Sequence, residues 1–224
     1  MMRPLQLAEL TGPLNARLIG ADAAISGVST DSRAIEVGDL FVALRGDRHD
    51  GHRYLEQVEE AGAAAAVVDL EANCSLPLLQ VADTRLALAE LSAFNRNLYT
   101  GPLVAITGSN GKTTAKNLVH GVLSRRGETM ATAGNYNNEI GVPLTLLRLS
   151  PETRFAVVEM GAASIGDIAY LCRIGRPTVS LLLNAMQAHL ESFGSVENIA
   201  SGKGEIFDGL DAGDFAIINA DQHW

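Results

Sequence analysis

The sequence predicts an α/β protein with two domains, a small α/β domain followed by a parallel-sheet domain with helices on both faces. Three observations predict this fold. Apolar runs alternate with helical segments after residue 102, a glycine-rich turn joins one such run to a helix, and the elements before residue 82 are shorter and mixed. The boundary is expected at the helix that begins near Thr84, which gives domains of residues 1–82 and 83–224.

Length and composition narrow the class of protein. A chain of 224 residues is long enough for two modest domains with a core. The net charge of −9 argues against nucleic acid as the main partner, because a phosphate backbone requires a basic face. The two cysteines, Cys74 and Cys172, lie in apolar segments and indicate buried thiols in a reducing compartment. No apolar run is long enough for a membrane span or a signal peptide, so a cytoplasmic location is expected.

The expected elements of the first domain are short. Helices are expected at residues 5–10 and 52–61, and Gly62 is typical of the end of the second. Strands are expected at residues 17–19, 25–28, 40–44, 65–68 and 78–81. A longer helix, capped by Asp83 or Thr84, is expected to run to about Tyr99 and to end at Gly101-Pro102.

The second domain alternates strand and helix. Strands are expected at residues 103–107, 129–132, 154–159, 178–183 and 215–219. Helical segments are expected at residues 115–126 and 144–147, and from about Ser195 onward. This alternation is typical of a parallel sheet, in which ligands bind at the carboxyl ends of the strands. The residues at those ends are therefore the candidates for function.

The most informative stretch is Thr107-Gly108-Ser109-Asn110-Gly111-Lys112-Thr113-Thr114, between an apolar strand and a helix. Main-chain N–H groups of such a turn and of the helix N-terminus hold phosphate, and Lys112 adds a positive charge. Thr113 supplies a hydroxyl where a nucleotide-bound magnesium ion needs one. The general pattern has an earlier glycine where this chain has Ile106, and glycine-rich turns also end strands for structural reasons. The coincidence of strand, turn, lysine, hydroxyl and helix nevertheless predicts binding of a nucleoside triphosphate.

Two other strand ends carry polar side chains. Glu159 ends the strand at 154–159, where it either binds magnesium or only terminates the strand at the solvent boundary. Asn184 ends the strand at 178–183, and His189 follows it. His189 is either an ordinary polar loop residue or a functional imidazole, which could complete the shell of a cation or be oriented by a carboxylate such as Glu191.

Two further features leave alternatives open. Lys203 lies in a helix between Gly202 and Gly204, where each glycine costs roughly 1 kcal/mol relative to alanine. Small neighbours would allow a close approach to another element, although a solvated lysine is the ordinary interpretation. Asn137 and Asn138 either offer amides to an anionic or peptide-like ligand or serve turn formation.

Together these residues resemble the Mur ligases, the ATP-dependent amide-bond-forming enzymes of bacterial cell-wall synthesis. The motif at 107–113, Glu159 with Gly161, Asn184 with His189, and Lys203 carry the resemblance. The stretches at 29–33, 38–46, 50–52 and 137–143 are most similar to the family member that adds D-alanyl-D-alanine to UDP-N-acetylmuramoyl-tripeptide. The resemblance extends over nearly the whole chain.

The resemblance implies a role for each residue. The ATP phosphates would be bound by Gly108, Ser109, Asn110, Gly111, Lys112, Thr113 and Thr114. Thr113 and Glu159 would hold a first Mg²⁺ and His189 a second, while Lys203 would carry a carbamate beside the metals. Lys112, His189 and Lys203 would thus be the catalytic residues. The UDP group would contact Ser29, Thr30, Asp31, Ser32 and Arg33, and the sugar-peptide would contact Asn137 and Asn138.

The chain is shorter than the family pattern, in which a third domain binds the incoming amino acid or dipeptide. The resemblance therefore implies an incomplete central domain, with the acceptor site and part of the adenine pocket missing. Two alternatives remain: a nucleotide-binding fragment without catalysis, and a related ligase such as folylpolyglutamate synthase. The first 82 residues argue against the latter, because that enzyme begins with its ATPase domain.

Overall fold

The computed structural model describes residues 2–46, 49–187 and 193–222. It divides into two compact units, Met1–Asn95 and Arg96–Trp224, and the division falls inside helix α3 (Thr84–Leu98). Within the described residues, no helix has the length and hydropathy that crossing a bilayer requires.

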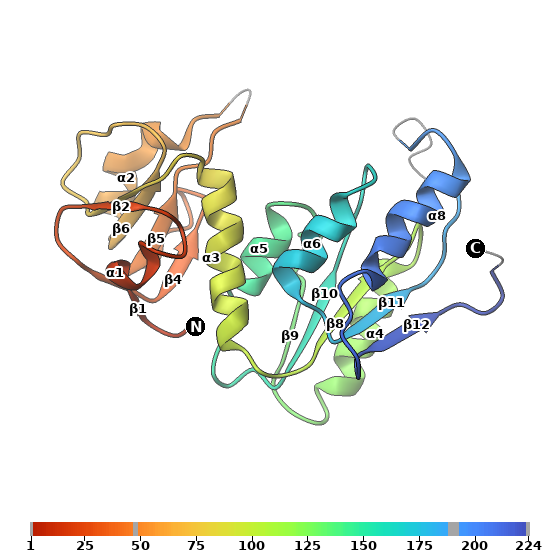
Figure 1. The fold of residues 1–224 in the computed structure, drawn as a ribbon. Coiled ribbons are helices and arrows are strands. Elements are labelled where there is room, and N and C mark those ends of the chain that lie inside the picture. Colours follow the sequence, from red (N-terminus) through yellow and green to blue (C-terminus); the bar gives the residue numbers. More distant parts are fainter. Residues whose placement is uncertain (1, 47–48, 188–192, 223–224) are drawn as a thin grey trace. The chain divides into compact units, whose positions relative to one another are not determined.

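The first unit is built on a five-stranded sheet in the order β2–β7–β6–β5–β4 (Figure 1). Strands β4 to β7 pair in parallel, and β2 is antiparallel to β7. Their bounds are Arg17–Ile19 for β2, Gly27–Ser29 for β4, Asp39–Val42 for β5, Ala65–Val68 for β6 and Leu78–Gln80 for β7. The 3₁₀ helix η1 (Gly51–Tyr54) leads into α2 (Leu55–Glu60), whose buried Leu55 and Val58 join a core cluster that includes Phe41 and Val68.

The start of the chain differs from the predicted helix at residues 5–10. Leu5 and Gln6 form strand β1 (Leu5–Gln6), which pairs antiparallel with β3 (Ala24–Ile25), and only α1 (Leu7–Leu10) is helical. The Gln6 N–H donates to Glu9 Oε1 over 2.9 Å in a capping box that begins the helix. The pairing with a strand far along the chain outweighs the local helical pattern.

The second unit holds a five-stranded, wholly parallel sheet in the order β12–β11–β8–β10–β9. The strands are β8 (Leu103–Thr107), β9 (Thr129–Ala131), β10 (Phe155–Glu159), β11 (Val179–Leu182) and β12 (Phe215–Ile218). The helices are α4 (Lys112–Leu123), α5 (Gly141–Leu146), α6 (Asp167–Gly175) and α8 (Val196–Gly204), with the 3₁₀ helix η2 (Glu205–Phe207). Figure 1 shows α4 on one face of the sheet and α5, α6 and α8 on the other, which confirms the predicted architecture.

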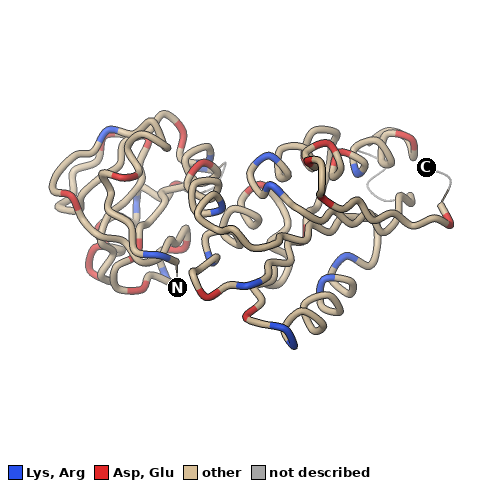
Figure 2. Tube along the Cα trace, turned by 60° about the horizontal axis from the view of Figure 1, so that its bottom comes forward, with Lys and Arg blue, Asp and Glu red and all other residues tan. Residues whose placement is uncertain are grey.

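The strand order places the turn after β8 between two other strand ends. Glu159 of β10 lies opposite Ile106, and Leu182 of β11 lies opposite Thr107. Positively and negatively charged residues are spread over both units (Figure 2). Glu159 is the one charged residue in the five strands of this sheet, and it is 2% exposed. A buried carboxylate at the carboxyl edge of a parallel sheet requires a polar partner, and this edge is where the site is built.

Candidate nucleotide and magnesium site

The glycine-rich turn lies tightly against the exit of strand β11. Gly108 has φ +155° and Gly111 has φ +82°, in the region that favours glycine. A Cβ at Gly108 would lie 3.0 Å from Leu183 Cβ and 3.3 Å from the Asn184 nitrogen. The glycine at this position therefore allows the turn to pack directly on the neighbouring strand end.

Asn184 fastens the turn at that strand end. The Ser109 N–H donates to the Asn184 carbonyl and the Asn110 N–H to Asn184 Oδ1, both over 3.0 Å, and Asn184 Nδ2 returns a bond of 3.1 Å to the Asn110 carbonyl. The main-chain N–H groups of Ser109 and Asn110 are thus engaged within the chain. Sequence reasoning placed Asn184 at a strand end but gave it no contact with the turn, because the contact depends on β11 being the neighbour of β8.

Helix α4 begins without a side-chain cap, and the Lys112 ammonium lies beside its first turn. Its N-cap is Gly111, which offers no side-chain acceptor, and the first N–H groups of a helix have no acceptor within the helix. Lys112 Nζ donates to the Gly108 carbonyl over 2.7 Å, which holds the ammonium above the turn. Uncapped N–H groups, the helix dipole and an ammonium together form a binding place for an anion such as phosphate.

Glu159 joins α4 to the segment before α5. Its Oε2 accepts from Thr113 Oγ1 over 2.9 Å and its Oε1 accepts from Asn137 Nδ2 over 2.8 Å. The structure therefore brings together the hydroxyl and the carboxylate that were predicted to hold magnesium. Asn137, which the resemblance assigns to the substrate, donates to the same carboxylate. That contact could not be read from the sequence.

A cavity of about 290 Å³ adjoins this cluster and collects several predicted residues. Its lining includes Lys112, Asn137, Asn138, Gly161 and Lys203. Asn138 Oδ1 accepts from the Gly141 N–H over 2.9 Å, so its side chain also serves the turn that begins α5. Asn138 therefore serves turn formation. Both asparagines also line the cavity, where a ligand could reach them.

Lys203 is buried rather than solvated. It is 2% exposed, and its Nζ lies 5.9 Å from the centroid of the Phe193 ring. Burial, and secondly the charge of Lys112, lower the pKa of Lys203 to about 8. A Cβ added at Gly202 would lie 2.8 Å from Phe193 Cε1. A Cβ added at Gly204 would have no neighbouring atom within 4 Å. Only the first of the two flanking glycines is thus required for close packing.

The residues predicted to bind metal can be compared with what magnesium prefers. Among residues 2–46, 49–187 and 193–222, no three His, Cys, Asp or Glu side chains converge as a protein cage. Magnesium is usually held by one or two carboxylates together with phosphate oxygens and water, so Thr113 with Glu159 is a sufficient protein contribution. His189, predicted as a second ligand, and Glu191 lie outside the described residues.

The residues predicted for the UDP group lie at the carboxyl end of β4 in the first unit. The Asp31 carboxylate accepts from Arg33 Nε over 2.9 Å and from Arg33 Nη2 over 2.7 Å, which lowers the pKa of Asp31 to about 2. Ser29 Oγ accepts from the Asp31 N–H over 3.1 Å. The Arg33 side chain is 81% exposed, so this short turn presents a guanidinium to solvent.

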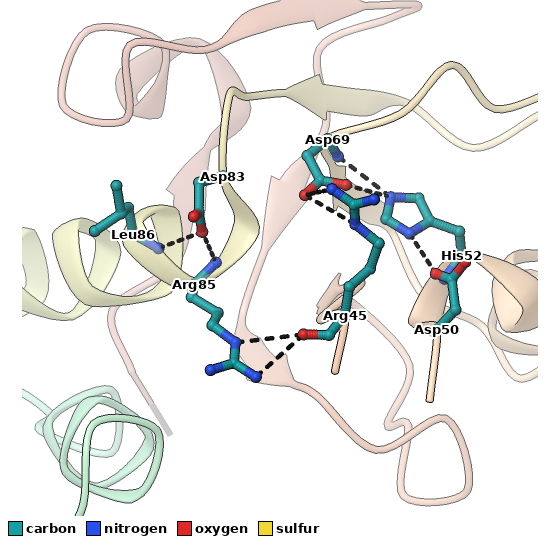
Figure 3. Close-up of polar contacts among 7 residues, drawn as sticks. All are labelled: Arg45, Asp50, His52, Asp69, Asp83, Arg85 and Leu86. Atoms are coloured by element: carbon teal, nitrogen blue, oxygen red, sulfur yellow. Dashed lines mark hydrogen bonds and ion pairs between the residues drawn. The ribbon is translucent and has the colours of Figure 1, made fainter. Parts of the chain in front are cut away.

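A second polar cluster follows β5 and β6 at the same edge of that sheet (Figure 3). Asp69 Oδ2 accepts from Arg45 Nη2 over 3.0 Å, and the Asp69 N–H donates to His52 Nε2 over 3.2 Å. His52 Nδ1 lies 2.8 Å from Asp50 Oδ1, and Arg85 donates to the Arg45 carbonyl. In the sequence, Arg45, Asp50 and His52 stand out only within the stretches that carry the family resemblance. Their arrangement ties the segment after β5 to the end of β6.

The strand, the glycine-rich turn, the helix that follows it and the buried Glu159 define a domain with a P-loop type of fold. The family model described as "Mur ligase middle domain" matches residues 106–224, and the one described as "Mur ligase family, catalytic domain" matches residues 24–96. The chain therefore belongs to the Mur ligase family.

Relatives within this family are similar over nearly the whole chain. The chain is 47% identical to the UDP-N-acetylmuramoyl-tripeptide--D-alanyl-D-alanine ligase of Escherichia coli (strain K12), over 99% of this chain and 49% of that protein. It is 42% identical to the ligase of the same name from Haemophilus influenzae, over 99% of this chain and 50% of that protein. The chain thus spans about half the length of these curated relatives.

Solved structures of Mur ligases are also similar to this chain. A crystal structure of MurF from Acinetobacter baumannii superposes with a TM-score of 0.92 at 36% identity, covering 99% of this chain and 50% of that one. MurF ligase from Thermotoga maritima, crystallised in complex with ADP, has a TM-score of 0.81 at 35% identity and covers 88% of this chain and 46% of that one.

Proposed function

We propose that this chain forms the ATP-binding and UDP-substrate-binding parts of a ligase that adds D-alanyl-D-alanine to UDP-N-acetylmuramoyl-tripeptide. The observation that supports it most is the joint position of the α4 N-terminus, Lys112 and the Thr113–Glu159 pair at one sheet edge. Relatives that carry the name of this activity share 42% and 47% of the aligned residues. Use of ATP agrees with a cytoplasmic location.

The proposed reaction activates a carboxylate. The tripeptide carboxylate attacks the γ-phosphorus of ATP, ADP leaves, and an acyl phosphate forms. The amine of D-alanyl-D-alanine then attacks the acyl carbon, phosphate leaves, and an amide bond forms. Both reactants of the first step are anions, so Lys112 and the α4 N–H groups serve to offset charge on the transferred phosphoryl group.

The residues present fit a magnesium ion. Thr113 Oγ1 and the Glu159 carboxylate would hold it, and His189 is proposed for a second ion. When bound, the ion neutralises charge on the phosphate oxygens. Asn137, which donates to Glu159 Oε1 over 2.8 Å, orients the carboxylate.

Lys203 is suited to carry the carbamate. A pKa of about 8 leaves more of the amine neutral near physiological pH than an ordinary lysine, and only the neutral amine attacks CO₂. The nitrogen–carbon bond forms, the amine loses a proton, and the product is an anion in place of a buried cation. A carbamate at this position in the cavity would face Lys112, whose charge it would partly offset.

The nucleotide base also has a candidate place. A cavity of about 430 Å³ is lined by Asn184, Phe207, Ile218, Asn219 and other residues of α8 and the ends of β11 and β12. Apolar walls with amide groups at the edge suit a purine. Asn184 connects this cavity to the phosphate-binding turn, so one residue would position both ends of the nucleotide.

The substrate residues are proposed in two places. Ser29, Thr30, Asp31, Ser32 and Arg33 would contact the UDP group, and Asn137 with Asn138 would contact the sugar-peptide. The site for D-alanyl-D-alanine is not assigned to any residue of this chain. Because the chain spans about half of its relatives, the second candidate function is binding of nucleotide and UDP-substrate without turnover.

Calorimetric titration with ADP and Mg²⁺ tests the proposal. The wild-type chain should bind, and Lys112→Met should lose binding while its circular dichroism stays unchanged. Arg125→Met is the matched control, because it removes one exposed positive charge just after the end of α4. Equal affinity in the wild type and Lys112→Met would overturn the assignment of the turn. Phosphate release from ATP that requires both substrates separates ligation from binding alone.

A further inference from the structure

Lys116 is a buried lysine for which the reaction outlined above has no use. It lies in α4, is 5% exposed, and donates from Nζ to the Thr132 carbonyl over 2.8 Å. Lysine is almost never fully buried unless it is paired, because the ammonium loses its hydration. No motif in the sequence assigns Lys116 a role, so its burial has to be explained by the contacts it makes.

Thr132 connects Lys116 to Glu159 through hydrogen bonds. It is 2% exposed, and its Oγ1 accepts from the Glu159 N–H over 2.9 Å. Its own N–H donates to the Val157 carbonyl over 3.0 Å, which fixes it beside strand β10. One residue therefore accepts from Lys116 through its carbonyl and from the main chain of Glu159 through its hydroxyl.

Helix α4 is connected to Glu159 twice. Thr113 lies one turn before Lys116, so both side chains share a face of the helix. Thr113 Oγ1 bonds the Glu159 carboxylate directly over 2.9 Å, and Lys116 reaches the Glu159 main chain through Thr132. The two connections close a ring of hydrogen bonds around the hydroxyl and the carboxylate that would hold magnesium.

We propose that Lys116 is a positioning residue of the magnesium site, acting through Thr132 to hold Glu159 in place against α4. A metal ion bound between Thr113 and Glu159 competes for the same oxygen atoms that make the direct bond. The Lys116–Thr132 connection uses none of these atoms, so it persists when the ion is bound. This inference rests on the proposed nucleotide and magnesium binding.

If Lys116 had a purely structural role, a different effect of its replacement on magnesium dependence would be expected. Replacing a buried ion by an apolar side chain of similar length is often neutral or stabilising. If Lys116 only filled space, Lys116→Met would leave the magnesium dependence of nucleotide binding unchanged. If it positions Glu159, the variant would keep its affinity for ADP alone and need more magnesium for tight binding.

The test is calorimetric titration of the whole chain with ADP across a series of Mg²⁺ concentrations. Lys116→Met should raise the Mg²⁺ concentration at half-maximal enhancement by about tenfold, the loss typical of residues that orient metal ligands. Thr132→Val, which removes the acceptor of the Glu159 N–H, should shift it in the same direction. Lys116→Arg keeps a hydrogen-bond donor, so its Mg²⁺ requirement should lie between those of the wild type and Lys116→Met. Arg125→Met should have the same Mg²⁺ requirement as the wild type.

The outcomes separate the two proposals. If the wild type shows no binding of ADP with magnesium, the proposed function fails. If the wild type binds but Lys116→Met and Thr132→Val keep its magnesium dependence, the positioning role is wrong, whatever happens to their melting temperatures. If Lys116→Met does not fold, Thr132→Val and Lys116→Arg decide by the same measurement.

Discussion

At the scale of single residues, Lys203 lies in an environment that disfavours its charge. Its pKa of about 8 lies below the ordinary 10.5, because burial and Lys112 disfavour the charged amine. Between these two values the unfolded chain holds a proton that the folded chain has lost. The free energy of unfolding therefore rises with pH across this window, by up to about 3 kcal/mol from this group, and the destabilisation is fully present below pH 8.

Lys203→Met isolates this contribution. In buffer free of CO₂, urea denaturation should show the variant more stable than the wild type at neutral pH, because methionine fills the space without burying a charge. The difference should narrow as pH rises from about 8 through 10.5, and well above 10.5 the wild-type amine is neutral in both states. A difference that stays constant over this range would mean that Lys203 has the same pKa in the folded and unfolded chains, so that burial does not disfavour its charged amine.

The residues of the site were predictable to the extent that they depend on sequence order. Gly108, Lys112, Thr113 and Glu159 follow strands or begin a helix, so the strand–turn–helix pattern was enough to place them at one edge. The contacts of Asn184 with the turn and of Asn137 with Glu159 were not predictable. They depend on which strands are neighbours, and on the path of a loop, neither of which local pattern specifies.

At the scale of one element, helix α8 contains two glycines whose replacement by alanine should change stability differently. Gly204→Ala meets open space and should stabilise the chain by roughly 1 kcal/mol through helix propensity. Gly202→Ala gains the same propensity but places a Cβ 2.8 Å from the buried Phe193 ring, and such overpacking costs about 1–3 kcal/mol.

Thermal unfolding of these two variants compares the same substitution in the same helix. Gly204→Ala should melt above the wild type, and Gly202→Ala should melt below Gly204→Ala. Equal melting temperatures would show that Phe193 moves aside freely. The contact between α8 and Phe193, the aromatic residue beside Lys203, would then not be a fixed feature of the fold.

The accuracy of the predicted elements follows the way each one is stabilised. Strands of the second unit were predicted within a residue or two, because each of them is a nearly continuous apolar run, as is typical of parallel sheets. Helix α4 begins at Lys112, earlier than the predicted 115, since the glycine-rich turn itself supplies its N-cap. Residues 5–6 were predicted wrongly as helix because their pairing with Ala24–Ile25 is a long-range contact.

At the scale of the whole molecule, the two units divide the candidate chemistry between them. The nucleotide, magnesium and Lys203 features all belong to Arg96–Trp224, and the residues proposed for the UDP group all belong to Met1–Asn95. Each set lies at the carboxyl edge of a largely parallel sheet, where such folds bind ligands. The same rule of topology thus accounts for both candidate sites, although their sequences share no motif.

The last prediction concerns the edge of the second sheet. Strand β12 is an edge strand, and its Phe215, Ile217 and Ile218 side chains are 65%, 47% and 65% exposed. An apolar edge with unpaired main-chain groups is a template for pairing with another chain. We therefore expect this 224-residue chain to self-associate through β12 as its concentration rises.

Ile217→Lys places a charge on this edge and should weaken self-association, as measured by sedimentation velocity over a concentration series. Leu118→Lys is the matched control, since Leu118 is 67% exposed but lies on α4, away from any strand edge. If Ile217→Lys lowers association and Leu118→Lys does not, pairing at β12 is the cause. If both lower it equally, general apolar exposure is the cause, and if neither does, the edge is not the contact.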